Sequence, residues 1–600
     1  MSRSSILRIL LPFLICGVIP ATVFAQANSL YLPKMRYEPV IPRDHETPST
    51  FAGNVPVVGE QDQQATVIIE ELRGILILDS SKKLKLIAPS VEGVEFDCDR
   101  PRALAHTPEF QKILYKYIGK PFKVADITSL QKELNDLYQK YDIPVVGLVV
   151  PNQDVDSGSI QVVLYEGYVN SVRITGNKYF STPWMCSQVI TRPGTRIHES
   201  LLNEDARWLS RNPFRDVSAS LEPTDREEFF DVIYKVEEDY PIRAFAGYAD
   251  NGTRSTGIDR VVMGLTYTTP QDRLLNYTYS ATPNFENVQV HSGSYLLPLK
   301  NKDFISLYGY HGTMQPNMGN TLFNNEGVVW QTSLRYSKLL GITPKKDSRR
   351  EQRFNIGYDF KETNSDLDFG GFLVSSSEAQ ISQFVFGYND VYVNKNGFIS
   401  FDANLYWSPG KMSPKNNDEH FADLRWNSKS EYVYATADIT ATRFLSEGLQ
   451  WNSRLSGQWS STNLISIESF CLGGDGNVRG YDTFALSPDS GWVFSNELAT
   501  RYKKFGLSKA LRSSGLYSKV RTIDDEIQFY GFFDVGGGWN HTKYPIYDSQ
   551  YDSIAGTGVG LRYNFGPWVR LSAAYGFRLN DLYDDGAFQG RPHVSIVISR

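Results

Sequence analysis

The chain has 600 residues, which is too long for one compact core, so several domains are expected. Its formal net charge is −6 and it contains no basic run, which argues against nucleic acid as a partner. The aromatic content of 13% and the 47 glycines are high, as in membrane β-barrels, although a large soluble β protein has a similar composition.

Residues 1–27 are interpreted as a secretory signal peptide. Arg3 and Arg8 supply the charged start, residues 9–23 are apolar, and small residues at 23–27 offer a cleavage site. The apolar run is short and broken by two prolines, and no other segment has the roughly 20 apolar residues of a spanning helix. A mature protein embedded in a membrane would therefore be embedded as a barrel.

A proline-rich linker at residues 28–64 leads into two small domains of similar plan. In the first domain, residues 65–167, strands are predicted at 65–69, 74–77, 145–150 and 160–164, helices at 108–118 and 127–140, and an irregular segment at 79–106. In the second domain, residues 168–240, strands are predicted at 169–175, 217–221 and 229–236, and helices at 183–190 and 198–210. The order strand, two helices, two strands occurs twice and indicates an internal repeat.

Residues 241–600 alternate between apolar and polar side chains, which is the period of β-strands. In residues 399–407 the apolar side chains take the odd positions, whereas Ser400, Asp402 and Asn404 take the even ones. A strand with an apolar face and a charged face suits the wall of a membrane barrel, which has lipid outside and water inside. Several of these segments reach the ~9–11 residues that a tilted membrane-spanning strand needs. Sixteen strands are predicted, at 242–249, 259–268, 273–281, 288–297, 303–311, 327–338, 353–362, 380–390, 397–407, 431–441, 449–460, 491–502, 526–535, 554–565, 568–579 and 590–599.

Two motifs in this region carry the candidate functional site. The segment 470–481 reads F-C-L-G-G-D-G-N-V-R-G-Y and holds a single cation, Arg479. Its glycines are Gly473, Gly474, Gly476 and Gly480. Glycine at this density allows backbone conformations closed to other residues, so a loop can deliver the cation into a narrow space. The segment 531–539 reads G-F-F-D-V-G-G-G-W and places one carboxylate, Asp534, on the face predicted to line the lumen.

We predict that Arg479 reaches Asp534 inside a transmembrane barrel. In a partly dehydrated lumen such a pair can be bidentate, and loss of either partner would cost roughly 3–5 kcal/mol. The alternative is a glycine-rich surface loop with a solvated arginine and a structural aspartate at a strand end. The glycines 556, 558 and 560 have a period of two with no following helix, so they are interpreted as inward-facing strand residues rather than a nucleotide loop. No motif predicts an enzyme, a cofactor or a metal site.

Further motifs carry a family resemblance. The first small domain contains G-K-P-F at 119–122, and residues 150–167 read V-P-N-Q-D-V-D-S-G-S-I-Q-V-V-L-Y-E-G. The second contains V-R-I-T-G-N at 172–177 and L-N-E-D at 202–205. These runs resemble the POTRA domains of two-partner-secretion transporters of the ShlB/FhaC/HecB kind. The family's V-R-G-[FY] loop motif is matched by Val478, Arg479, Gly480 and Tyr481, and its strand-thirteen [FG]-x-D motif by Phe532, Phe533 and Asp534.

The resemblance implies a membrane β-barrel of about 16 antiparallel strands, preceded by two periplasmic α/β POTRA domains, in a Gram-negative-type outer membrane. The loop at about 461–490 would enter the lumen. The implied function is an outer-membrane transporter that captures an unfolded exported partner protein, of the haemolysin or adhesin kind, through its POTRA domains and secretes it through the lumen. Its implied partners are a large secreted β-rich cargo, outer-membrane lipid and the barrel-assembly machinery.

Two alternatives are an assembly insertase of the same superfamily, which usually has more than two POTRA domains, and a passive porin, which explains the alternation but not the motifs. Four features depart from the family. The insert at 79–106 is long, and the Pro-Gly turn before the last strand of the second domain is replaced by Pro223-Thr224-Asp225-Arg226. The prolines of 28–64 argue against a lumen-plugging helix, and the last strand ends at Arg600 rather than on an aromatic residue. Cys98 and Cys186 are either bridged or unpaired, and the residues leave both readings open.

Overall fold

The computed structural model describes residues 67–253, 255–316, 323–369, 372–506, 525–542, 551–582 and 589–600. The predicted signal peptide and linker, residues 1–27 and 28–64, lie outside this range. The described chain divides into two compact units, one of residues 67–239 with 344–347 and one of 240–343 with 348–600. Within the described residues no helix combines the length and the apolar character needed to cross a bilayer.

The first N-terminal domain packs two helices on a four-stranded sheet of order β3-β2-β6-β5, in which β2 runs parallel to both neighbours and β5 antiparallel to β6. Its elements are β1 (Val67–Ile69), β2 (Gly74–Leu78), η1 (Ser81–Lys83), β3 (Gly93–Asp97), α3 (Pro108–Tyr115), β4 (Phe122–Lys123), α4 (Val124–Lys140), β5 (Val146–Val149) and β6 (Ser159–Glu166). The prediction that 79–106 is irregular throughout is wrong, because it contains β3. This strand has only five residues and mixes charged with apolar side chains, so its period is too short to detect.

The second domain has a three-stranded sheet of order β7-β9-β8, with β7 parallel and β8 antiparallel to β9. Its elements, β7 (Tyr168–Thr175), α5 (Thr182–Gln188), α6 (Glu199–Leu209), β8 (Arg215–Pro223) and β9 (Phe229–Glu238), follow the predicted order. The buried Asp205 of the L-N-E-D motif accepts hydrogen bonds from the amides of Ile190 and Thr191 and from the hydroxyl of Tyr234. This motif therefore joins α6 to the sheet. Cys98 and Cys186 are free, so the bridge between them is not formed.

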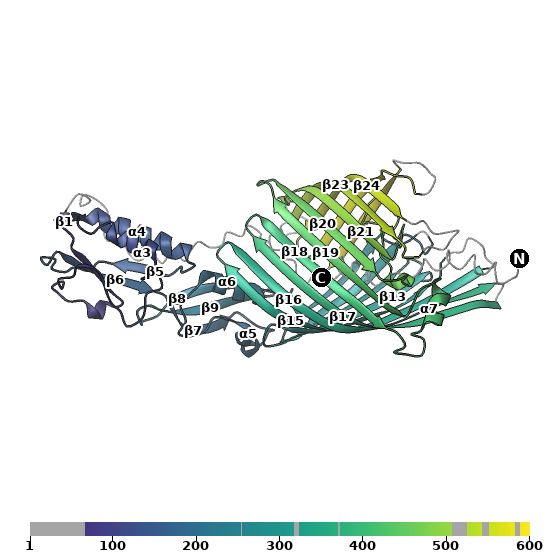
Figure 1. The fold of residues 1–600 in the computed structure, drawn as a ribbon, viewed down its shortest axis with the longest axis horizontal. Coiled ribbons are helices and arrows are strands. Elements are labelled where there is room, and N and C mark those ends of the chain that lie inside the picture. The colour runs from purple at the N-terminus through teal and green to yellow at the C-terminus, as the bar shows by residue number, and fades with distance from the viewer. Residues whose placement is uncertain are drawn as a thin grey trace, which may run out of the picture. The chain divides into compact units, whose positions relative to one another are not determined.

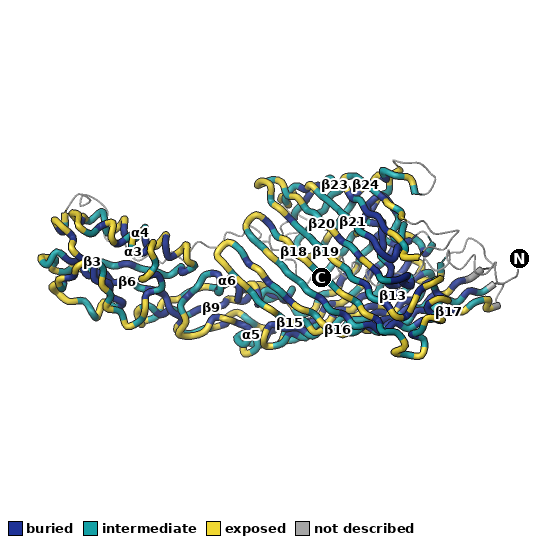
Figure 2. Tube along the Cα trace, viewed as in Figure 1, coloured by how far each residue is buried: buried dark blue, intermediate teal, exposed yellow. Residues whose placement is uncertain are grey.

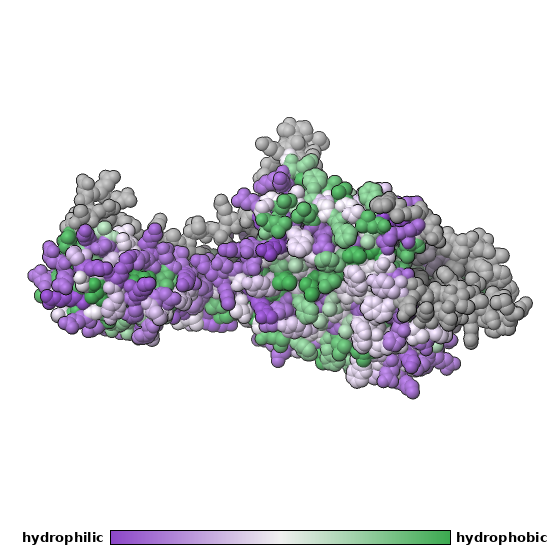
Figure 3. All heavy atoms as spheres, turned by 45° about the horizontal axis from the view of Figure 1, so that its top comes forward, coloured by the Kyte–Doolittle hydropathy of each residue, from purple (hydrophilic) through white to green (hydrophobic). Residues whose placement is uncertain are grey.

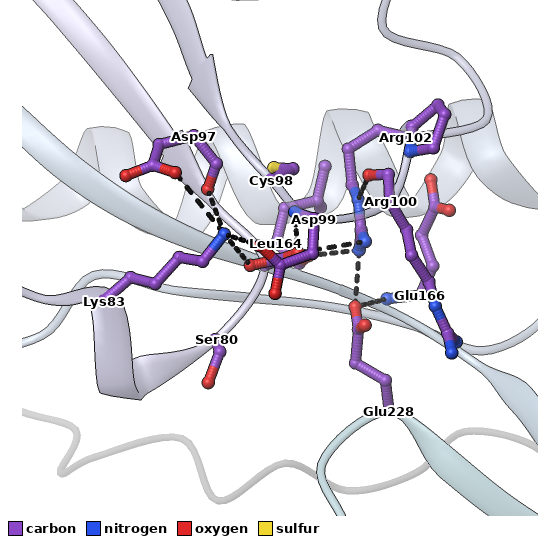
Figure 4. A network of polar contacts seen from close by, with 12 residues as sticks. Ser80, Lys83, Asp97, Cys98, Asp99, Arg100, Arg102, Leu164, Glu166 and Glu228 are labelled. Carbon is purple, nitrogen blue, oxygen red and sulfur yellow. Dashed lines mark hydrogen bonds and ion pairs between the residues drawn. The ribbon is translucent and has the colours of Figure 1, made fainter.

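Charged side chains join the two domains (Figure 4). The buried guanidinium of Arg102 donates to the carboxylate of Glu228, which precedes β9, and to the carbonyl of Leu164 at 3.0 Å. The same Glu228 carboxylate accepts from the amide of Glu166 at 3.0 Å. The Glu166 carboxylate in turn accepts from Arg196 of the second domain at 2.9 Å. Because each of these charges has an opposite partner, their burial is compensated and the junction is specific.

The C-terminal unit is a closed antiparallel barrel (Figure 1). Its last strand, β26, pairs with its first, β10, from Phe245↔Ser599 to Ala249↔Ser595. Its sixteen long strands are β10 (Ile242–Ala249), β11 (Arg260–Thr268), β12 (Leu274–Ala281), β13 (Val288–Pro298), β14 (Phe304–Met314), β15 (Phe323–Lys345), β16 (Ser348–Phe369), β17 (Phe372–Asn394), β18 (Gly397–Pro409), β19 (Glu431–Phe444), β20 (Leu449–Ser460), β21 (Ser490–Thr500), β23 (Asp525–Trp539), β24 (Asp552–Phe565), β25 (Val569–Arg578) and β26 (Gly590–Ser599). The two-residue β22 (Lys503–Lys504) continues β21 along β23. The predicted sixteen-stranded barrel is confirmed.

The alternation of the strands is also as predicted. On β18 the odd residues Ile399, Phe401, Leu405 and Trp407 are exposed, whereas the even Ser408 is buried. Apolar side chains gather on the barrel surface in Figure 3, and Figure 2 shows exposed and less exposed residues along each strand. The outer face of the barrel is therefore the apolar one, as lipid requires.

Two features of the barrel were not predicted. Strands β15, β16 and β17 have 22 or 23 residues, about twice the predicted length, and β16 and β17 pair from Ser348↔Asn394 to Phe369↔Phe372. In the added parts of these strands the strict alternation is lost, for example at Leu339-Leu340 of β15 and Ser375-Ser376-Ser377 of β17, although the ladder continues. A helix, α7 (Asp418–Leu424), lies between β18 and β19, capped by Asn417, and has too few residues to show a helical period. It belongs to the same end of the barrel as residues 461–489, because both segments follow strands of the same direction.

Candidate functional site

Residues 461–489 connect β20 to β21 and form a hairpin inside the barrel. The amide of Phe470 donates to the carbonyl of Pro488 at 2.8 Å, and Leu472 and Leu486 exchange backbone hydrogen bonds of 2.9 and 3.2 Å. Residues 478–481 at its tip are buried against side chains of the barrel wall. The predicted entry of this loop into the lumen agrees with these contacts.

Glycine is required at three of the four predicted loop positions. Gly473, Gly474 and Gly480 have φ values of +99°, +92° and +98°, a region that other residues rarely adopt. A Cβ atom on Gly473 would also lie 2.3 Å from the carbonyl oxygen of Asp482 on the returning limb. Gly476 is exposed and is not among the described glycines with positive φ, so its backbone does not require glycine.

The structure brings Arg479 and Asp534 into direct contact. The Nε and Nη2 atoms of Arg479 donate to Oδ2 and Oδ1 of Asp534 at 2.7 and 2.8 Å, and the backbone amide of Arg479 donates to Oδ2 at 3.2 Å. Arg479 is 5% exposed and Asp534 is fully buried. The pair is thus bidentate and shielded from solvent, the geometry in which such pairs are strongest.

Two further charges complete the cluster. Nη1 of Arg479 donates to Glu497 on β21 at 2.5 Å, and Arg562 on β24 donates to both oxygens of Glu497 at 2.8 and 3.0 Å. Two guanidinium groups therefore face two carboxylates, and the cluster carries no net charge. Sequence reasoning missed Glu497, although the alternation of β21 places it on the same face as the buried Val493.

Aromatic rings form the floor beneath both arginines. The Arg479 guanidinium lies 3.7 Å from the ring centroid of Phe532, and that of Arg562 lies 4.0 Å from the centroid of Tyr530. The glycines of β24 make room for these rings, since a Cβ atom on Gly558 would lie 2.7 Å from Phe532 and one on Gly560 2.3 Å from Tyr530. The interpretation of these glycines as inward-facing strand residues is confirmed.

The loop tip also touches the end of the barrel sequence. The amide of Gly480 donates to Nε2 of His593 on β26 at 3.1 Å. The hydroxyl of Tyr481 donates to the carbonyls of Asn580 and Ala555 at 2.7 and 3.1 Å. These partners of the loop carry no sequence signal, because isolated polar residues on lumen faces are common in barrels.

The two remaining motif residues lie in apolar surroundings. Val478 is fully buried in a cluster with Leu472, Tyr481, Val493 and Ile554. Phe533 points away from the lumen and is 47% exposed, whereas its neighbours Phe532 and Asp534 are buried. Phe533 therefore belongs to the lipid-facing surface and does not join the charged cluster.

Fold and site together define an outer-membrane β-barrel transporter with periplasmic POTRA domains. A family model described as haemolysin secretion/activation protein ShlB/FhaC/HecB matches residues 231–563, and one described as POTRA domain, ShlB-type, matches residues 91–167. Since the first match covers more than half of the chain, the chain belongs to the ShlB/FhaC/HecB family. The prediction of a two-partner-secretion transporter of the outer membrane is confirmed, and it is favoured over the insertase alternative.

Similar proteins include the heme/hemopexin transporter protein HuxB of Haemophilus influenzae (strain 86-028NP), 21% identical over 412 residues, or 66% of this chain and 70% of the relative. The outer membrane transporter CdiB of Escherichia coli is 20% identical over 525 residues, or 84% of this chain and 83% of the relative. The solved structure of CdiB from Escherichia coli aligns with a TM-score of 0.63 at 14% identity, covering 91% of this chain and 93% of that one. At this identity the structural likeness establishes the fold alone.

Proposed function

We propose that the loop of residues 461–489 closes the lumen of this transporter at rest, and that the contact between Arg479 and Asp534 is the latch that holds it. The observation that carries the proposal is the bidentate, buried contact between a residue at the loop tip and one on β23. Such a pair resists separation while it is dry, but each partner regains water when the lumen fills.

The cargo is an exported polypeptide that is unfolded when it reaches the barrel. It becomes β-rich when it folds outside the cell. The POTRA domains capture it by strand addition, for which the sheets offer β3 and β5 in the first domain and β7 and β8 in the second as edges. No catalytic step is required, because folding of the cargo outside the cell biases its exit. Outer-membrane lipid surrounds the apolar wall, and the barrel-assembly machinery inserts it.

The test is the conductance of the full-length protein in planar lipid bilayers without cargo. The variants Arg479→Ala and Asp534→Asn remove one partner each, and both are expected to convert a mostly closed channel into one with long open periods. The matched control is Arg454→Ala, because Arg454 on β20 makes a bidentate contact with Asp438, at 2.6 and 3.1 Å, between two wall strands. This control is expected to conduct like the wild type.

A second measurement follows the cargo itself. The protein encoded beside this transporter, if long, exported and repeat-rich, should appear at the cell surface with the wild type and not in its absence. Steady high conductance of the wild type, combined with unchanged surface delivery after deletion, would favour the porin and contradict the proposal.

A further inference from the structure

A second buried ion pair holds the lumen loop, and it lies at the base of the loop rather than at its tip. Glu468 ends a short 3-10 helix, η2 (Ser466–Glu468), on the limb that leads down from β20. Its carboxylate pairs with the ammonium group of Lys361 on β16, and the two side chains are 1% and 3% exposed. This pair is as deeply buried as the pair at the tip.

The barrel wall satisfies the remaining hydrogen-bonding capacity of Glu468. Tyr434 on β19 donates its hydroxyl to Oε2, and Gln383 on β17 donates its side-chain amide to the same oxygen at 3.4 Å. Gln458 on β20 donates to the carbonyl oxygen of Glu468 at 2.9 Å. The base of the loop is therefore held by β16, β17, β19 and β20, whereas the tip is held by β21, β23, β24 and β26.

Apolar packing surrounds the ion pair. Leu464, Ile465 and Ile467 of the loop form one buried cluster with Phe421 and Leu424 of α7 and with side chains of β13, β14, β15, β17 and β19. The helix and the loop base thus pack together against the barrel wall at the end of the barrel to which both belong.

Arg425, directly after α7, ties this helix to both limbs of the loop. Its Nη1 atom donates to the carbonyl of Leu464 at 2.5 Å and to Asp489 at 2.6 Å. The Asp489 carboxylate also accepts from the amide of Leu464 at 2.8 Å. Release of the loop base would therefore move the two limbs and α7 as one body.

A permanent plug would not need a buried ion pair at its base. Replacing such a pair with apolar side chains of similar size is often neutral or stabilising, because both charges lose their water on burial. When the lumen opens, Glu468 and Lys361 regain that water, whereas apolar surfaces would gain nothing. The ion pair is therefore suited to a contact that comes apart and forms again.

We propose that Glu468 and Lys361 form a second latch of the lumen loop, on a different arc of the barrel wall from the latch of Arg479 and Asp534, and that full opening requires the release of both. The proposal rests on the proposed function of the loop as the closure of the lumen. Glu468 and Lys361 act as positioning residues for the loop base. An extended polypeptide in the lumen can replace both partners, because its amides donate to the carboxylate and its carbonyls accept from the ammonium group.

The test uses the full-length protein in planar bilayers without cargo. Glu468→Gln and Lys361→Met each keep the shape of the side chain and remove one charge. Each variant is expected to spend about ten times as long in partly conducting states as the wild type. This tenfold change corresponds to about 1.4 kcal/mol. Arg479→Ala combined with Glu468→Gln is expected to reach full conductance more often than either single change. The control is Arg350→Gln on the same strand, because Arg350 is 52% exposed and pairs with Asp390.

The outcomes separate the two proposals. If Glu468→Gln and Lys361→Met conduct like the wild type while Arg479→Ala is open, the proposal of a second latch is overturned. The proposed function of the loop tip would then stand. Closed behaviour of every variant, including Arg479→Ala, would contradict the proposed function itself. If the pair has a purely structural role, its variants should unfold at a lower temperature and conduct like the wild type. The unfolding temperature of each variant is measured by its heat-modified gel mobility. A lower unfolding temperature with unchanged conductance would also overturn the second latch.

Discussion

Arg479 is suited to its position by the shape of its guanidinium group as well as by its charge. One edge of the plane donates to both oxygens of Asp534, another nitrogen donates to Glu497, and the face of the plane lies over the ring of Phe532. A lysine ammonium group is a compact point charge that cannot make the bidentate and stacked contacts together. The latch therefore depends on geometry that only arginine supplies.

Arg479→Lys is accordingly expected to behave more like Arg479→Ala than like the wild type. It keeps the positive charge but loses one charge-assisted hydrogen bond, worth about 1.5–3 kcal/mol, so the open probability should rise about tenfold or more. The measurement is single-channel recording in planar bilayers, with Arg454→Lys as the control at a wall pair that does not involve the loop. A closed Arg479→Lys channel would mean that charge alone holds the loop.

At the scale of the element, β24 and β25 have backbones that receive the loop directly. A Cβ atom on Gly556 would lie 2.0 Å from the carbonyl oxygen of Arg479, and one on Gly576 would lie 2.5 Å from the amide nitrogen of Gly480. Both clashes are with main-chain atoms, which cannot rotate away as the end of a flexible side chain can. The closed position of the loop tip thus requires glycine on the wall as well as in the loop.

Gly556→Ala is therefore expected to push the loop tip off the wall, although the substitution leaves every charged residue of the latch unchanged. Overpacking of this kind costs about 1–3 kcal/mol in the closed state, so the channel should open more often although the barrel still folds. The same recordings and heat-modified gel mobility measure both effects. Gly457→Ala on β20 is the control, because its Cβ atom would meet its nearest neighbour at an ordinary 3.5 Å. An unchanged Gly556→Ala channel would contradict the close packing of the tip.

The strands were predictable because lipid on one face and water on the other impose a period of two on each span. Arg479 and Asp534 were predictable because a lone cation stands among glycines and a lone carboxylate in an aromatic strand. Glu497 and Glu468 were not, since polar residues on lumen faces are common and the path of the loop decides which of them meet. β3 and α7 are too short to show a period, and the added parts of β15 and β17 lose the strict alternation.

At the scale of the whole molecule, the two N-terminal domains form a single compact unit through their junction. Glu228 adopts a φ of +65°, a left-handed conformation that costs roughly 1–2 kcal/mol, and its carboxylate meets the fully buried side chain of Arg102. The amides of Tyr168 and Glu166 donate to this same residue at 2.7 and 3.0 Å. A strained residue that is held by Tyr168 within its own domain and by Arg102 and Glu166 across the junction indicates a fixed angle between the domains.

The junction also contains a contact that should depend on pH. Ser81 and Ser80 of the first domain donate to the carboxylate of Glu227 in the second at 2.6 and 2.7 Å, and these hydrogen bonds lower the pKa of Glu227 below its ordinary 4.5. A lowered pKa in the folded state stabilises the junction above the ordinary pKa, and this contribution is lost as the pH falls through the lowered value. Because Glu227 is exposed, solvent screening limits the effect to about 1 kcal/mol or less.

The full-length protein in detergent should therefore show faster amide hydrogen exchange at residues 166–168 at pH values below about 4.5 than at pH 7, once the intrinsic pH dependence of exchange is removed. Ser80→Ala combined with Ser81→Ala should reduce this difference, because the hydrogen bonds from the two hydroxyl groups are the largest causes of the lowered pKa of Glu227. Glu228→Gln should instead raise exchange at both pH values, since it removes the nearer carboxylate partner of the buried Arg102 and leaves only Asp79, at 4.0 Å. Residues 130–137 of α4 serve as the internal reference, because they belong to the core of the first domain. Equal exchange of the junction at both pH values in the wild type would mean that Glu227 contributes nothing to the angle, and Glu228 alone would then fix it.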